Sequence, residues 1–108
     1  MEIQHTAKDF ELTAAIRGYA EEKFGKACSQ LDGFSGIRLH LTYEKIGHSN
    51  HGDNQGCTAV LFVPNSEPLK AEEATSDLYA TIDAAAKDIE RQVRRYREKH
   101  IERQQRGG

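Results

Sequence analysis

The sequence predicts an α+β domain with the element order β-α-β-β-β-α, in which two helices pack on one face of a four-stranded, mostly antiparallel sheet. Two observations support this. Apolar residues recur at steps of three and four in two stretches, and they alternate with polar residues in the stretches between. The 108 residues suffice for one domain. We divide them into an α+β domain over residues 1–100 and a basic C-terminal tail, or frayed helix end, over residues 101–108.

The first strand and the first helix are expected near the N-terminus. Glu2–Thr6 alternates weakly and favours a short strand, and residues 7–11 connect it to the helix. Thr13 suits the N-cap, where a hydroxyl accepts from a free backbone N–H. The apolar stripe of this helix is Ile16, Ala20, Phe24, Ala27 and Leu31.

Three strands are expected in the middle of the chain. Ile37–Glu44 has the clearest alternation, which predicts one buried and one solvated face. Residues 45–56 form a loop or long hairpin tip, and Cys57–Val63 is the next strand. The turn residues 64–66 then separate it from a strand over Glu67–Ala74.

A long amphipathic helix is expected over Asp77–Arg106. Ser76 is its predicted N-cap, and Asp77 suits the first turn because a carboxylate is favoured at the positive end of the helix dipole. Its apolar stripe consists of Leu78, Ile82, Ala85, Ala86, Ile89, Val93 and Tyr96.

Charge is distributed unevenly along the chain. The net charge is −2, which alone argues against a polyanionic partner. Residues 87–108, however, hold eight basic and four acidic side chains, whereas residues 1–86 hold seven basic and thirteen acidic ones. Such an asymmetry indicates a localised surface that faces a polyanion.

The candidate binding residues lie on two helix faces. On the long helix, Lys87, Arg91 and Arg94 share one narrow sector with Arg95 beside it, and on the first helix Lys23 and Lys26 flank Tyr19 within about 60°. A solvated face with intrahelical pairs such as Asp83–Lys87 and Glu90–Arg94 explains this pattern equally well. The many arginines favour phosphate, and the lack of interleaved aromatics favours folded RNA over single-stranded bases.

Other chemistries have weaker support. Cys28 and Cys57 are expected to be two free thiols. The segment His48–His51 with Asp53 fits no zinc spacing, so no metal and no cofactor is expected. His5, His40 and His100 are scattered and are expected at the surface or at an edge. No catalytic motif occurs, and the carboxylates near Glu72 lack a predicted pocket, so the chain is not expected to be an enzyme.

The chain is expected to act in the cytoplasm. No apolar run approaches the roughly 20 residues that span a bilayer, so no membrane association is expected. The first residues lack the basic and apolar regions of a secretory signal.

Two motifs carry a resemblance to a known family. The segment Asp77–Asp83 followed by Ile89–Val93 resembles the second helix of the short ribosome hibernation promoting factors of bacteria, in the ribosome-associated inhibitor / sigma-54 modulation protein family. Phe10–Thr13, Arg17 and Lys23–Lys26 are similar to the first-helix pattern of that family. The resemblance covers nearly the whole chain.

The resemblance implies a fold and a function. The fold would be similar to a double-stranded-RNA-binding domain. The protein would bind the small ribosomal subunit and its ribosomal RNA near the decoding region, block tRNA and mRNA binding, and repress translation in stationary phase or stress. It would promote inactive ribosome dimers, with a ribosome-dimerising helper protein as a further candidate partner and no DNA expected.

The resemblance also implies the contact residues. These would be Lys23, Lys26, Lys87, Arg91, Arg94 and Arg95, with Arg97 and Lys99 as auxiliaries. The alternative that stays open is a protein–protein interaction module without direct RNA binding.

Overall fold

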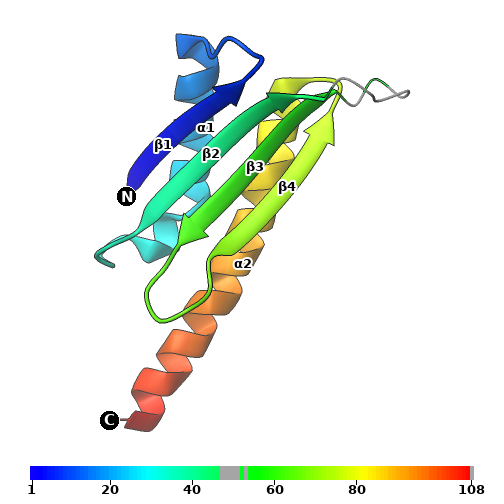
Figure 1. The fold of residues 1–108 in the computed structure, drawn as a ribbon. Helices are drawn as coiled ribbons and strands as arrows, with labels where there is room; N and C mark the ends of the chain where they lie inside the picture. Colours follow the sequence, from blue (N-terminus) through cyan, green and yellow to red (C-terminus); the bar gives the residue numbers. More distant parts are fainter. Residues whose placement is uncertain (47–51, 53, 108) are drawn as a thin grey trace.

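The computed structural model describes residues 1–46, 52 and 54–107, with side chains described as far as Lys99. Its elements follow the predicted order (Figure 1). They are the strand β1 (Glu2–Lys8), the helix α1 (Ala14–Ala27), the short 3₁₀ helix η1 (Ser29–Leu31), the strands β2 (Arg38–Lys45), β3 (Gln55–Phe62) and β4 (Leu69–Thr75), and the helix α2 (Leu78–Gly107). The predicted α+β class is therefore confirmed.

The four strands form one sheet in the order β1-β2-β3-β4. β1 runs parallel to β2, and the two following pairings are antiparallel, so the sheet is mostly antiparallel as predicted. A parallel pair needs a crossover connection, and α1 supplies it. The register aligns Ile3, Leu39, Leu61 and Leu69 across all four strands, which places an apolar row on one face.

Both helices cover that apolar face (Figure 1). α1 lies behind β1 and β2, and α2 lies behind β3 and β4 and continues past the end of the sheet. The predicted stripes of both helices are buried, and Phe24, Leu41, Ile82 and Val93 are at most 1% exposed. Fully burying such a side chain contributes roughly 1.5–3 kcal/mol, so this layer holds the domain together.

Several boundaries differ from the prediction. β1 extends to Lys8 because its last residues pair with β2. α1 ends at Ala27, and Leu31 lies in η1 while still reaching the core. α2 is capped by Asp77 and not by Ser76, because Asp77 Oδ1 accepts from the backbone N–H of Tyr79 at 3.1 Å. The backbone of residues 101–107 continues α2. The division at residue 101, with a basic tail or frayed helix end over residues 101–108, stays a prediction.

Thr81 anchors the start of α2 on the sheet. Its side chain is 0% exposed, and its hydroxyl donates to the carbonyl of Gln55 at 2.9 Å. The same oxygen accepts from the backbone N–H of Thr75 at 3.1 Å. These bonds join the first turn of α2 to β3 and to the end of β4, which fixes where the helix starts along the sheet.

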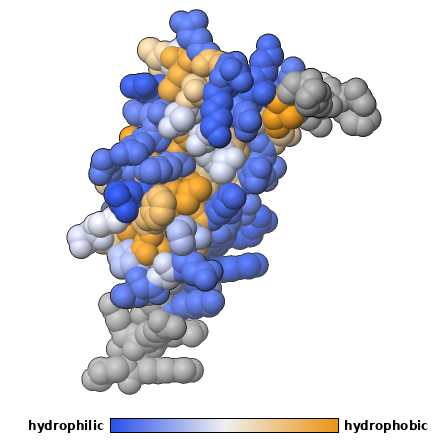
Figure 2. Space-filling view, viewed as in Figure 1, coloured by the Kyte–Doolittle hydropathy of each residue, from blue (hydrophilic) through white to orange (hydrophobic). Residues whose placement is uncertain are grey.

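The opposite face of the sheet is open (Figure 2). Hydrophilic side chains surround a central apolar area on this face. The outward residues of β3 include Val60 and Phe62, both half-buried, and Arg38 lies 5.2 Å above the Phe62 ring. The two helices therefore occupy one face, and the predicted binding residues belong to that side. No helix in the described part of the chain is both long and apolar enough to cross a membrane.

Candidate nucleic-acid interface

A groove runs between α1 and α2. It is lined by Lys23, Lys26, Ala27, Asp83, Ala86, Lys87 and Glu90. Ala27 and Ala86 are buried, and their small side chains allow the two helices to approach closely at this point. The fold thus brings Lys23 and Lys26 of α1 alongside Lys87 of α2, as the two predicted basic faces require.

Asp83 links the two helices at one end of this groove. Its Oδ1 accepts a 2.7 Å hydrogen bond from the Tyr19 hydroxyl, and Lys23 Nζ lies 3.9 Å away. The hydrogen bond to the carboxylate, more than any other cause, raises the pKa of Tyr19 to about 12. The interpretation of the basic side of α2 as a solvated face paired Asp83 with Lys87 along the helix. Asp83 is instead turned towards α1, where it orients Lys23.

The exposed ridge of α2 is partly neutralised by its own carboxylates. Arg91 donates to Asp88 Oδ1 at 2.9 Å, and Arg94 donates to Glu90 Oε1 at 3.4 Å, so the predicted Glu90–Arg94 pair is confirmed. The hydrogen bond from Arg91 lowers the pKa of Asp88. Lys87 has no carboxylate within 4.0 Å among the described side chains. These exposed pairs are worth little energetically, so a phosphate can compete for the guanidinium groups.

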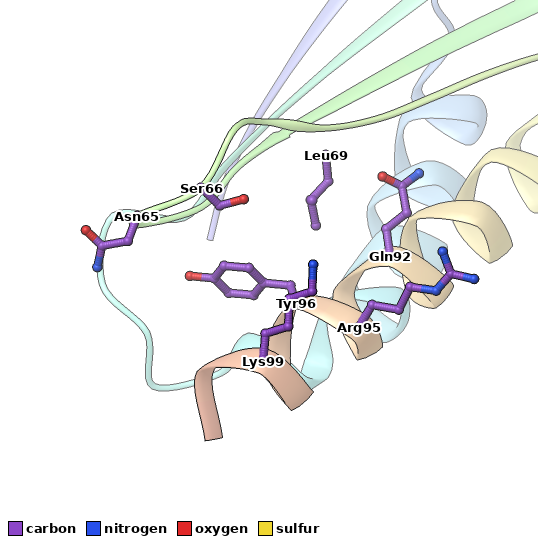
Figure 3. A pocket seen from close by; sticks show the side chains of 7 residues that line it. All are labelled: Asn65, Ser66, Leu69, Gln92, Arg95, Tyr96 and Lys99. Atoms are coloured by element: carbon purple, nitrogen blue, oxygen red, sulfur yellow. The ribbon is translucent and has the colours of Figure 1, made fainter. Parts of the chain in front are cut away.

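Arg95 and Lys99 face away from the groove. They lie on the β4 side of α2 and line a separate hollow with Gln92 and Tyr96 of α2, Leu69 of β4, and Asn65 and Ser66 of the preceding turn (Figure 3). The predicted basic face of α2 is therefore divided between two sides of the helix.

Arg97 has an internal partner. Its Nη1 donates to the backbone carbonyl of Gln30 at 2.6 Å, and its side chain is half-buried. This bond holds η1 against α2, a structural role that the sequence did not predict. An additional role of Arg97 in binding stays a prediction.

The structure also brings together two aromatic side chains that the sequence keeps 60 positions apart. The rings of Tyr19 and Tyr79 meet edge to face with centroids 4.9 Å apart, and Tyr79 is 40% exposed. No aromatic interleaves with the arginines, as noted from the sequence, but this pair lies beside Lys23. In the sequence, the one indication of this pair is that Tyr79 shares a sector of the helix wheel with Asp83 and Glu90. The structure shows that this sector faces α1.

His5 was expected at the surface or at an edge, and it lies in the edge strand β1. Its side chain is only 5% exposed, and its ring nitrogens contact the Tyr43 hydroxyl at 2.9 Å and Glu21 at 3.0 Å. Cys28 and Cys57 are free thiols, as predicted. Both are buried, and burial raises the pKa of each thiol to about 12.

The histidine-rich candidate metal segment, His48–His51 with Asp53, lies outside the described residues. Within the described part of the chain, no cluster of three His, Cys, Asp or Glu side chains is arranged to hold a metal ion.

Comparison with known proteins identifies the family. Residues 3–101 match the family model described as Sigma 54 modulation protein / S30EA ribosomal protein. The chain belongs to this family. A member from Azotobacter vinelandii, named ribosome hibernation promoting factor, is 31% identical over 97% of this chain and 91% of its own length. A ribosome hibernation promotion factor from Deinococcus radiodurans is 30% identical over 96% of this chain but only 53% of its own length.

Solved structures of similar proteins share the fold. The Thermus thermophilus Protein Y N-terminal domain superposes with a TM-score of 0.74 at 27% identity, covering 89% of this chain and 99% of that domain. A ribosomal subunit interface protein from Coxiella burnetii gives a TM-score of 0.75 at 22% identity, covering 91% and 99% of the two chains. The arrangement of two helices on one face of a four-stranded sheet is thus shared with these solved structures.

Proposed function

We propose that this protein is a ribosome hibernation factor that binds the small ribosomal subunit and represses translation. Membership of the S30EA family and the names of its relatives support this proposal. The binding site would lie near the decoding region, where the bound protein excludes tRNA and mRNA. The protein would act in the cytoplasm in stationary phase or stress, and it would promote inactive ribosome dimers together with a ribosome-dimerising helper protein.

One observation carries the proposal, namely that folding collects cations from two helices on the same side of the sheet. Lys23 and Lys26 line the groove opposite Lys87, and Arg91 and Arg94 continue along the exposed ridge. Cations spread over two helices match the phosphates of folded RNA, which is recognised mainly by shape and backbone contacts. Such a placement would allow a chain with a net charge of −2 to bind a polyanion.

Co-sedimentation with purified small subunits tests this proposal. We expect the double variant Arg91→Glu and Arg94→Glu to lose binding. The matched control, Lys8→Glu and Arg38→Glu, changes the charge equally on exposed residues of the strands and should bind like the wild type. Wild-type binding should fall steeply with salt, because phosphate contacts release counterions. Equal binding by both double variants would contradict the proposed face.

A second measurement separates direct RNA binding from the protein–protein alternative. The complex with small subunits is treated with nuclease before sedimentation. We expect the protein to be released as the ribosomal RNA is degraded. A complex that survives this treatment would favour recognition of a protein partner. Cell-free translation with the same variants then checks repression, which should follow small-subunit binding.

A further inference from the structure

The hollow on the β4 side of α2 has the size of a ligand site. It measures about 330 Å³ and opens between the turn over residues 64–66 and the helix (Figure 3). Small-molecule sites in proteins range over roughly 300–1,000 Å³. This hollow is therefore large enough for a small ligand or for one residue that projects from a longer chain. It is separate from the groove that carries the proposed function, because α2 presents a different side to each.

Hydrogen bonds hold both walls of this hollow in place. The Tyr96 hydroxyl donates to the carbonyl of Pro64 at 2.7 Å, which ties the turn to α2. Gln92 Nε2 donates to the carbonyl of Lys70 at 2.8 Å, which ties β4 to the same helix. A site whose walls are fixed before binding loses less conformational freedom when a ligand enters.

The side chains of the hollow are suited to an anion joined to an apolar group. Arg95 and Lys99, one helical turn apart, have no carboxylate within 4.0 Å among the described side chains, in contrast to Arg91 and Arg94 on the ridge. The half-buried Leu69 supplies an apolar surface.

The facing turn adds a hydrogen-bonding group to the hollow. The amide of Asn65 points away from the hollow, whereas the Ser66 side chain points into it (Figure 3). The Ser66 hydroxyl donates to the carbonyl of Glu67 at 3.0 Å and keeps its lone pairs as acceptors. A ligand of this hollow would therefore combine negative charge, a hydrophobic face and a polar edge.

We propose that this hollow binds one unpaired nucleotide of RNA, with its phosphate between Arg95 and Lys99 and its base against Leu69. The Ser66 hydroxyl then faces the polar edge of the base. This inference rests on the proposed function and adds a specific contact to it, since unpaired bases that leave the stack are the part of RNA that proteins read most selectively. The groove and ridge would hold the RNA backbone while the hollow selects a bulged position.

A titration with nucleoside 5′-monophosphates tests the hollow directly. Adenosine and uridine monophosphate are added to the isotope-labelled full chain, and amide chemical shifts are followed by NMR. We expect shifts at residues 65–69 and 92–99, and their loss in Ser66→Phe, which fills the hollow, and in Lys99→Met. Lys45→Met, on an exposed lysine of β2 that does not line the hollow, is the matched control for Lys99→Met and should keep the response. The amide spectrum of each variant also confirms that it is folded.

Inorganic phosphate is the second arm of this titration. We expect it to shift fewer amides than the nucleotides at equal concentration, because it leaves the Leu69 surface uncovered. Equal responses would mean that the site takes only phosphate and would overturn the nucleotide proposal. The absence of any response to the nucleotides would overturn it as well.

RNA duplexes with and without a single bulged nucleotide separate this proposal from the ribosome proposal. We expect the wild type to bind the bulged duplex more tightly than the fully paired one, because only the bulge supplies an unpaired base, and we expect Ser66→Phe to lose this preference. The Arg91→Glu and Arg94→Glu variant should weaken binding to both duplexes alike. Small-subunit binding without a bulge preference would overturn the hollow alone. A bulge preference without small-subunit binding would overturn the ribosome proposal and leave the hollow standing.

Discussion

The hydroxyl of Tyr19 donates a 2.7 Å hydrogen bond to Asp83, which joins the two helices across 64 positions of sequence. Lys23 lies 3.9 Å from the same carboxylate and 5.4 Å from the centre of the Tyr19 ring. The bond therefore fixes the spacing of α1 and α2 at the end of the groove, and it also orients one of the proposed phosphate-binding lysines.

Replacing Tyr19 by phenylalanine should lower stability in a pH-dependent way. The folded pKa of Tyr19, about 12, exceeds its usual value of 10, so the bond contributes to stability below pH 10. That contribution is lost as the pH rises from 10 towards 12. Urea unfolding should thus show Tyr19→Phe to be less stable than the wild type at pH 8, with a difference that shrinks above pH 10.

Tyr79→Phe is the matched control for this prediction. It removes a hydroxyl from the other ring of the edge-to-face pair, and no hydrogen bond of that hydroxyl to a described residue is found. We expect it to unfold like the wild type at pH 8. Equal destabilisation by both variants would show that the Tyr19–Asp83 hydrogen bond makes no specific contribution to the free energy of unfolding.

Thr81→Val should destabilise the domain by about 1–3 kcal/mol. The substitution keeps the shape but leaves the carbonyl of Gln55 and the N–H of Thr75, both part-buried, without their partner. Urea unfolding monitored by circular dichroism measures the change. Thr42→Val, on a half-buried threonine of the open sheet face, is the control and should stay within about 0.5 kcal/mol of the wild type.

Arg97→Met should mainly lower the stability of the domain, whereas Arg94→Met should mainly weaken binding to the small subunit. Loss of the bond from Arg97 to the carbonyl of Gln30 should cost about 1 kcal/mol of stability, with a small effect on small-subunit affinity. Arg94→Met should change stability by less than about 0.5 kcal/mol, because its partner Glu90 is exposed, yet it should weaken binding more. Urea unfolding measures the stability of both variants, and co-sedimentation measures their binding to small subunits. A larger loss of binding in Arg97→Met than in Arg94→Met would contradict the structural role of Arg97 and the binding role of Arg94.

Both cysteines should resist thiol reagents in the folded protein. Cys28 and Cys57 are at most 3% exposed, and burial raises each thiol pKa to about 12, so little reactive thiolate forms at pH 8. A colorimetric disulfide reagent should therefore label neither residue quickly until urea is added, when two thiols per chain should react. Rapid labelling of one thiol without urea would contradict the burial of that side chain.

Local patterns predicted the elements well. Steps of three and four identified both helix stripes, and alternation identified the strands, because each pattern reports which side of a single element is apolar. Thr13 was assigned as an N-cap, and its hydroxyl accepts from the backbone N–H of Ile16 at 3.2 Å. The cap of α2 was misassigned, since Ser76 and the adjacent Asp77 are both good caps and the choice depends on where Thr81 docks on the sheet.

The sequence by itself determined the elements, their apolar faces and the basic character of α2, because these depend on residues a few positions apart. The tertiary structure decided how the cations are divided. A helix wheel places Arg94, Arg95 and Arg97 at angles around one axis, but only packing against α1, η1 and β4 turns Arg94 to solvent, Arg95 to the hollow and Arg97 to the carbonyl of Gln30. The partner of Asp83 was decided in the same way, because a contact across 64 positions depends on the packing of two helices and not on the periodicity of either.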